Sequence, residues 1–422
     1  MKKFLTALLL MLLLSTPAQA LPVQEAVQTA LINNPNLRRS AQSILAAEES
    51  LKSARGKKGV SVSASGSVNA SKTEGVDPSE HASTGLSASL PLYSGKRLET
   101  AIKYAELGIE VSKLDFVQAQ DDLIYQVATA YVNALENLAT SKVDLETEKN
   151  LAEHEKMIAA QFNAGAKAKI DLLRAQVETS NALQDAARSH AAYEVALTNL
   201  AALMSNDSIV NLSVEDFDTR LEVGDVEKYL AEATENRSDL KSDALKIEQG
   251  ELNVTSAKSG WLPNVNANVG TDLNAASDRW HITPDASAWI SASWNIFDSG
   301  VTRAEVEAAK VEVERLKLAM DADLDSVQES VVTAHKNLKI AQLRLTTTQK
   351  AVELAEEERY IATERYNAGE GILLDILDAE VALSTAKKNN VSARYDVMRY
   401  SFDLAHAAGN TLLALGKTKE AI

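Results

Sequence analysis

The sequence predicts a mainly helical chain that also carries four β-strands and is internally duplicated. Three observations lead to this fold class. The sequence repeats itself at an offset of 203 to 205 residues, two long stretches without proline carry an apolar heptad, and a pair of alternating segments precedes each stretch. One set of helices and strands is therefore expected to occur twice.

Residues 1–20 have the pattern of a secretory signal. Lys2 and Lys3 precede an apolar run over residues 4–14, and Ala18-Gln19-Ala20 provides a small-residue cleavage site. The apolar run is too short to remain in a bilayer as a permanent anchor. We therefore expect export and cleavage after Ala20.

Composition excludes several classes of protein. A net charge of −16 disfavours nucleic-acid binding, because phosphate affinity depends on clustered Lys and Arg. The chain has no cysteine, which excludes disulfides, thiol catalysis and cysteine-bound metals. The six histidines are scattered without HExxH spacing, and neither a GxSxG elbow nor a phosphate-binding glycine loop occurs. We expect no enzyme activity, no catalytic residues, no metal and no cofactor.

Two repeated motifs define the duplication. FNAG recurs as YNAG, and the following IDLLRAQVE recurs as LDILDAEVA. We expect a first structural repeat over residues 21–210 and a second over residues 211–422. Each repeat would contain short helices, two strands, a long helix, a turn and a returning helix, with the turns at residues 163–167 and 367–371.

Long helices are predicted because no proline occurs within residues 92–262 or 285–422. Apolar positions step by three and four in both copies, although Asp121 and Lys142 interrupt the heptad of the first, and this pattern indicates coiled-coil packing. These positions are Leu114, Val117, Ile124, Ala128, Tyr131, Leu135, Leu138 and Leu145, then Val327, Val331, Ala334, Leu338, Ala341, Leu345, Val352 and Ala355. Thr302 with Glu305 predicts a capping box that opens the second long helix.

The predicted helices differ in length. The outgoing segment 97–163 would span about 100 Å, whereas its return over residues 168–204 would cover only about 55 Å. The second copy shows the same mismatch between residues 302–367 and 372–408. Further helices near residues 36–55 and 239–259 have about the right size to pack on the unpaired parts.

Before each long helix lie two strands in which apolar and polar residues alternate. We expect them at about residues 60–70, 82–92, 264–273 and 285–297, with Ser and Asn dominating the polar positions. Such strands suit a bilayer-spanning barrel with a wet interior, although a soluble sandwich with one solvated face fits the alternation equally well. Aromatic residues at the strand ends favour the membrane: Tyr93, Trp261, Trp294 and Phe297.

Four strands cannot close a barrel, and open sheet edges are not tolerated in lipid. Several chains must therefore contribute to one barrel. Two chains would give eight strands and a packed interior, and three would give twelve strands and more room. A conduit favours three, but arithmetic alone leaves the number open.

The chain resembles the TolC family of outer-membrane efflux and secretion proteins. PLYSG and NIFDSG before the long helices carry the resemblance, together with FNAGAKAKIDLLRAQ and YNAGEGILLDILDAE at the turns. The resemblance implies a homotrimer with a twelve-stranded barrel in the cell outer membrane and a twelve-helix tunnel in the periplasm. It also implies two partners, a periplasmic adaptor (membrane fusion) protein and an inner-membrane transporter, and the activity of a passive exit duct.

Individual residues take roles from the same resemblance. The adaptor-docking tips would be Ala164, Gly165 and Ala166, with Ala368, Gly369 and Glu370. The entrance gate would include Asp375, Asp378, Tyr366, Arg394 and Asp171. Asp171 and Asp375 have a second interpretation, because acidic residues are favoured at helix N-termini. Gly371 departs from the pattern, since the best-known members have an arginine there.

Two rival functions differ from the duct. An exported periplasmic coiled-coil spacer with soluble β-modules would explain the helices and the signal. An adaptor subunit would have one hairpin with a compact flanking domain, which the two repeats argue against. Efflux through a tripartite pump and type I secretion use the same duct, and the sequence does not separate them.

Overall fold

The computed structural model describes residues 21–72, 79–206, 212, 224–276 and 283–414. The predicted signal at residues 1–20 lies outside the described residues. The chain divides into two compact units. The hairpin unit comprises Met1–Arg38, Gln118–Arg237 and Asp325–Ile422, and the sheet unit comprises Arg39–Val117 and Ser238–Leu324. Each unit therefore draws on both halves of the sequence.

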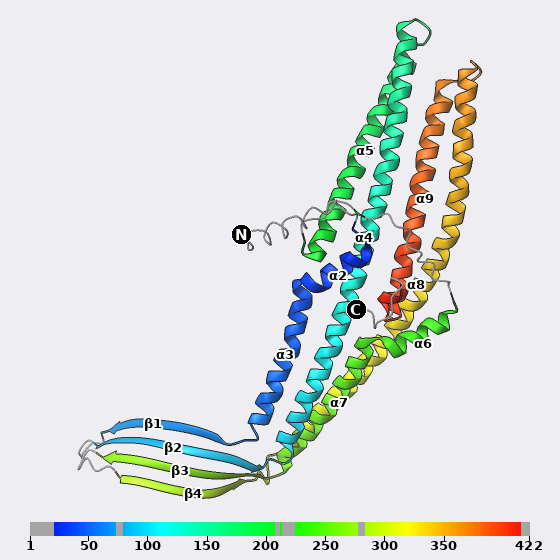
Figure 1. Cartoon of the computed structure of the whole chain (residues 1–422). Helices are drawn as coiled ribbons and strands as arrows, with labels where there is room; N and C mark the ends of the chain where they lie inside the picture. Colours follow the sequence, from blue (N-terminus) through cyan, green and yellow to red (C-terminus); the bar gives the residue numbers. More distant parts are fainter. Residues whose placement is uncertain (1–20, 73–78, 207–211, 213–223, 277–282, 415–422) are drawn as a thin grey trace, which may run out of the picture. The chain divides into compact units, whose positions relative to one another are not determined.

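The sheet unit contains one antiparallel sheet in the order β1-β2-β3-β4 (Figure 1). Its strands are β1 Ser61–Ser71, β2 Ser79–Tyr93, β3 Asn264–Ala276 and β4 Thr283–Ser293. The last strand ends at Ser293, so Trp294 and Phe297 follow the strand instead of lying in it. Because β2 pairs with β3, the sheet joins the two halves of the chain.

Side chains alternate between a polar and an apolar face of this sheet. On the polar face, Ser63 lies opposite Ser87 and Ser67 opposite Ser83. The hydroxyl oxygens of both pairs are 2.9 Å apart. On the apolar face the large side chains are exposed: Val62, Val68, Leu86, Val269 and Ile290. Within the described residues, these side chains have no cover.

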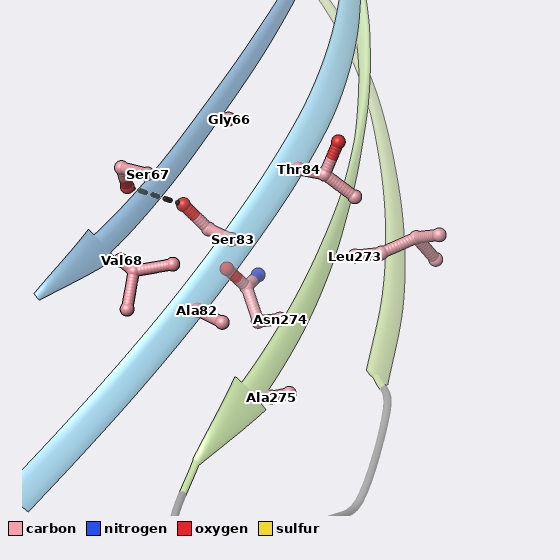
Figure 2. Close-up of a pocket in the computed structure, with 9 residues that line it drawn as sticks. All are labelled: Gly66, Ser67, Val68, Ala82, Ser83, Thr84, Leu273, Asn274 and Ala275. Atoms are coloured by element: carbon pink, nitrogen blue, oxygen red, sulfur yellow. Dashed lines mark hydrogen bonds between the residues drawn. The ribbon is translucent and has the colours of Figure 1, made fainter.

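Figure 2 shows a shallow hollow on β1, β2 and β3. Small side chains line most of it, and the hydrogen bond between Ser67 and Ser83 joins two of its strands. No titratable side chain contributes to the lining. The hollow therefore offers no acid or base that could activate its Ser and Thr hydroxyls.

Two pairs of long helices dominate the chain (Figure 1). The outgoing helices are α4 Arg97–Asn163 and α8 Val301–Asn367, each of 67 residues. The returning helices are α5 Lys169–Met204 and α9 Leu373–Ala407. None of the described helices combines the length and the apolar character needed to cross a bilayer.

Shorter helices precede each half's strands. They are α2 Val23–Asn33, α3 Pro35–Gly56, α6 Val226–Asn236 and α7 Ser238–Lys258, with a 3-10 turn η1 at Ser259–Trp261 and the final α10 at Thr411–Ala414. The junction residues bond to the returning helices in the same way. Asn34 Nδ2 donates to the Leu203 carbonyl at 3.0 Å, and Arg237 Nη1 donates to the Ala407 carbonyl at 3.2 Å. Both bonds satisfy carbonyls that a helix C-terminus leaves free.

The start of α8 differs from the expected capping box. The Asp298 carboxylate accepts hydrogen bonds from the Thr302 backbone N–H at 2.8 Å and from its hydroxyl at 2.5 Å. These bonds, first the one from the hydroxyl, lower the pKa of Asp298. Asp298 precedes the helix and can reach its free N–H groups, so the Thr302–Glu305 interpretation was wrong.

The predicted coiled-coil positions of α8 are all buried or half-buried, whereas two of those predicted for α4 are exposed. Ile124, Ala128 and Tyr131 of α4 are fully buried, but Val117 and Leu145 are exposed. Buried residues also include Leu123, Val127, Val132 and Ala134. In its middle, α4 therefore buries a band wider than one heptad seam, because it packs on more than one neighbour.

Candidate entrance at the helical turns

The two turns between long helices have the same backbone. Gly165 has φ +75° and Gly369 has φ +79°. In each turn the glycine N–H donates to the carbonyl three residues earlier, and the next N–H donates to the carbonyl five residues earlier. A Cβ at either glycine would meet no atom within 4 Å. Backbone conformation therefore requires these glycines, and crowding does not.

The predicted docking residues lie on the surface of both turns. Ala164, Gly165 and Ala166 are exposed in the first, as are Ala368, Gly369 and Glu370 in the second. Some of their backbone N–H groups are already used in hydrogen bonds within the turn: Ala164 donates to the Ala160 carbonyl, and Ala368 donates to the Glu364 carbonyl. The two tips therefore present short side chains on a fixed backbone.

Tyr366 joins the two hairpins. Its side chain is only 8% exposed. The hydroxyl donates to Gln161 Oε1 of α4 at 3.1 Å, and the Lys167 ammonium lies 4.6 Å from the centre of the ring. A cation at this distance from an aromatic face is attracted by it. Sequence reasoning identified Tyr366 but missed both of its partners in the first hairpin.

The gate aspartates sit in the first turns of the returning helices. Asp375 is exposed and accepts a long hydrogen bond from the Ile372 N–H at 3.5 Å. Asp171 occupies the same place in α5 and is half-buried. This geometry supports the helix N-terminus interpretation for both residues. Asp378, also exposed, lies on the same face of α9 as Asp375, because residues three apart are neighbours on a helix.

Arg394 lies far from these residues. It stands 21 residues beyond the start of α9, which corresponds to about 30 Å of helix. Tyr366 lies one residue before the end of α8, at the turn. The two side chains therefore cannot bond to each other within one chain, and the structure does not bring the five predicted gate residues together as one cluster.

Gly371 packs tightly against the end of α8. Its N–H donates to the Arg365 carbonyl at 3.0 Å. A Cβ at this position would lie 3.0 Å from the Tyr366 nitrogen and 3.2 Å from the Arg365 carbonyl carbon. A long side chain at position 371 would therefore require the turn to move.

A buried ionic group close to the turns escaped the sequence analysis. Glu380 of α9 is 3% exposed, and its carboxylate accepts from Arg359 Nη1 at 3.2 Å and from Asn150 Nδ2 at 3.4 Å. His154 Nε2 lies 3.8 Å from the same carboxylate. Burial raises the pKa of Glu380, but His154 and Arg359 together outweigh burial and hold the pKa below its usual value. We call Asn150, His154, Arg359 and Glu380 the Glu380 cluster.

One sequence signal could have pointed to this cluster. Glu380 falls in the buried stripe of α9 between Ile376, Leu377 and Leu383. A carboxylate at such a position needs polar partners. Their identity could not be read from the sequence, because Asn150 lies 230 residues away.

The predicted interface aromatics gather at one end of the sheet. Tyr93 ends β2 opposite Val265, and Trp261 lies in η1 just before β3. Trp294 follows β4, and its indole N–H donates to the Trp261 carbonyl at 3.0 Å. All three are substantially exposed, and Phe297 is more exposed still. Exposed aromatic rings therefore occur at the end of the sheet that leads to the helices.

In the part of the chain that the structure describes, no three His, Asp or Glu side chains form a group that could hold a metal ion.

Comparison with known proteins identifies the family. The model of the outer membrane efflux protein family matches residues 26–206 and 229–410. The chain is 22% identical over 430 residues to outer membrane protein TolC of Escherichia coli strain K12, covering 97% of this chain and 87% of that protein. Protein CyaE of Bordetella pertussis is 23% identical, with 92% of this chain and 84% of CyaE covered.

Solved structures share the fold. The outer-membrane channel OprN superposes with a TM-score of 0.80 at 20% identity, covering 92% of this chain and 90% of OprN. The Campylobacter jejuni CmeC outer membrane channel gives a TM-score of 0.80 at 19% identity, with 92% and 85% covered. With matches along both halves, the chain belongs to the outer membrane efflux protein family.

Proposed function

We propose that this protein is the outer-membrane exit duct of a tripartite efflux pump or a type I secretion system. The observation that carries the proposal is the family match along both halves of the chain, at residues 26–206 and 229–410. The protein acts in the cell outer membrane as a channel and lets substrates pass. A periplasmic spacer is not favoured, because the relatives that match are outer-membrane proteins.

Three copies would complete the pore. Both outer strands of the described sheet, β1 and β4, have one unpaired edge, and the apolar face is uncovered. Lipid does not tolerate open edges, so strands of neighbouring subunits must pair with them. Twelve strands leave a wider interior than eight. We therefore propose a homotrimer whose polar Ser and Asn face lines the lumen.

The duplicated architecture supports the duct. The long helices α4 and α8 begin 204 residues apart and have equal lengths. The preceding helices α3 and α7 begin 203 residues apart. We propose that residues 21–210 and 211–422 are two repeats, which would give a trimer six similar helical hairpins around one axis.

Partners are proposed at the exposed turns. Relatives carry names such as "Outer membrane efflux protein BepC" and "Toluene efflux pump outer membrane protein TtgI". We propose that the tips around Gly165 and Gly369 dock a periplasmic adaptor coupled to an inner-membrane transporter. Their short side chains and fixed backbone would let a partner approach closely. No nucleic acid is involved.

The entrance would be narrowed and charged by Asp375 and Asp378. Three-fold symmetry turns each exposed aspartate into a ring of three carboxylates, and such rings attract cations. Tyr366, held by Gln161 and Lys167, would keep the two hairpins of each subunit together at the entrance. Arg394 lies farther along α9 and Asp171 belongs to α5, so neither contributes a carboxylate to the Asp375–Asp378 rings.

Single-channel recording in planar lipid bilayers tests the function and the gate together. The purified mature protein should conduct ions, and a trivalent cation on the periplasmic side should block the current. The double variant Asp375→Ala with Asp378→Ala should need at least a tenfold higher cation concentration for block, because the rings are removed.

Glu353→Ala with Glu356→Ala is the matched control. Both residues are exposed on α8 and have the same spacing of three, so the variant loses equal charge elsewhere. Unchanged block in the aspartate variant would refute the gate, and absence of conductance in the natural protein would refute the duct.

A further inference from the structure

The Glu380 cluster connects three helices of the hairpin unit. Glu380 belongs to α9, Arg359 to α8, and Asn150 and His154 to α4. Its contacts therefore link the second hairpin to the first as well as the two arms of the second hairpin. The cluster borders an apolar core that contains Leu151, Ile158, Ile376 and Leu377.

The buried carboxylate of Glu380 holds α9 in place through the hydrogen bonds that it makes with α8 and α4. A buried carboxylate that loses its partners retains its desolvation cost, so displacement of α9 relative to α4 and α8 is opposed. Arg359 Nε is buried without a hydrogen-bond partner, so one donor of the cluster is already unsatisfied. A shift of α9 that breaks the bonds of Glu380 would leave further buried polar groups unsatisfied.

Within residues 97–204, all of which the structure describes, the first hairpin has no such cluster. Subtracting the repeat offset of 204 places Gln176 at the position of Glu380, and Gln176 is exposed. The counterparts of Asn150 and His154 in α8 are Leu354 and Glu358, which are exposed as well. Of the two returning helices, both described in full, α9 has this anchor and α5 does not.

Glu380 lies close to the aspartates along a continuous helix. It follows Asp378 by two residues and Asp375 by five, which is about 8 Å of helix. A stiff helix transmits the position of Glu380 to both carboxylates. We propose that Glu380 is a positioning residue that sets the resting width of the entrance by holding the first turns of α9. The inference rests on the proposed function of Asp375 and Asp378.

A second ion pair provides the matched control. Arg344 of α8 bonds to Asp396 of α9 at 2.6 Å. Asp396 is buried like Glu380 but lies 16 residues farther from the turn, about 24 Å along α9. It joins α8 to α9 as Glu380 does, yet it is too distant to position the entrance aspartates.

The test compares Glu380→Gln with Asp396→Asn in single-channel recordings of the reconstituted full assembly. Both changes remove a charge and keep similar size and hydrogen-bonding capacity. Glu380→Gln should raise the occupancy of the widest conductance state about fivefold or more, as expected for the loss of a buried charged contact. Asp396→Asn should leave that occupancy within about twofold while it lowers the unfolding temperature.

Milder variants guard against misfolding. Asn150→Ala and His154→Gln each weaken the cluster and keep Glu380, and both should widen the entrance in the same direction as Glu380→Gln. If all three cluster variants occupy the widest conductance state as often as the natural protein does, the inference is overturned. It is also overturned if Asp396→Asn raises this occupancy as much as Glu380→Gln does, because the effect would then reflect a general loosening of the helices. If the natural protein forms no pores, both this inference and the proposed duct are wrong; if it conducts normally and only these variants have no effect, the inference alone is wrong.

Discussion

The two hairpins have the same backbone but different interiors. Over most of α5 the buried residues are small and recur every seven positions at Ala175, Ala182, Ser189 and Ala196, and only near its end do the larger Leu200 and Met204 follow. In α9, the first buried residues are Leu373, Ile376 and Leu377, followed by the charged Glu380. Turn geometry and helix length are therefore preserved between the halves, while side-chain packing is not. The second hairpin is anchored within its own chain, and more of the first remains available to other chains.

The largest effect of this difference in packing is expected at a pair of leucines that occupy equivalent positions in the two hairpins. Leu377 is 3% exposed, whereas Leu173, its counterpart at the offset of 204, is 46% exposed. Leu377→Ala should lower the free energy of unfolding by about 2–5 kcal/mol, because a buried leucine leaves a cavity. Leu173→Ala should cost less than about 1 kcal/mol. Urea titration of both variants in detergent, followed by circular dichroism, gives the comparison.

Equal costs for the two leucines would contradict the comparison. They would mean that Leu173 is covered by a neighbouring subunit to the same extent as Leu377 is covered by its own chain. The half-buried Leu172, counterpart of Ile376, should give an intermediate cost and serves as an internal check.

The turn glycines should behave alike, in contrast to the leucines. Gly165→Ala and Gly369→Ala place a Cβ in a left-handed conformation, which costs roughly 1–2 kcal/mol. Open space around both glycines means that no further clash is added. The loss should be measured as a fall in unfolding temperature for each variant. A much larger loss at only one turn would show that the two tips are not equivalent in the subunit.

Two carboxylates of α9 should respond to pH in opposite directions. Burial raises the pKa of Asp403 above its usual value, although Tyr125 donates a hydrogen bond to it at 2.8 Å. Its charged form is therefore disfavoured by folding, and Asp403→Asn should slightly raise the unfolding temperature at neutral pH. This gain should vanish as the pH falls to about 4 and Asp403 takes up its proton.

Glu380 has the reverse sign. Its pKa is held below the usual value, so the stability that it contributes is present at neutral pH and declines as the pH falls through its folded pKa. Glu380→Gln should therefore lower the unfolding temperature at neutral pH and matter less in acid. Parallel pH profiles for Glu380→Gln and Asp403→Asn would show that their environments are not distinct.

Much of the fold could be predicted from the sequence because proline and glycine mark its breaks. The first long helix has the predicted bounds Arg97–Asn163, because Gly165 follows two residues later in the turn. The family and the outer-membrane location expected from the turn motifs are confirmed by the family match. The start of α8 was predicted wrongly because two capping patterns overlap there, and only the structure shows that Asp298 makes the bonds.

The site was less accessible to sequence reasoning. Local motifs identified Tyr366 and the two turns, because the geometry of a turn is set by residues close to it in the sequence. Gln161, Lys167 and the Glu380 cluster could not be found in this way, because their contacts join helices more than a hundred residues apart in the chain or depend on how the hairpins pack. The exposure of Leu145 has the same origin, since a heptad does not reveal how many neighbours a helix has.

We propose that one chain cannot form the pore alone and that three chains complete it. Native mass spectrometry of the processed protein, extracted from outer membranes in mild detergent, tests this proposal most directly. We expect a single dominant species with three times the mass of the processed chain. A species of one chain that stays dispersed after the detergent is removed would contradict it.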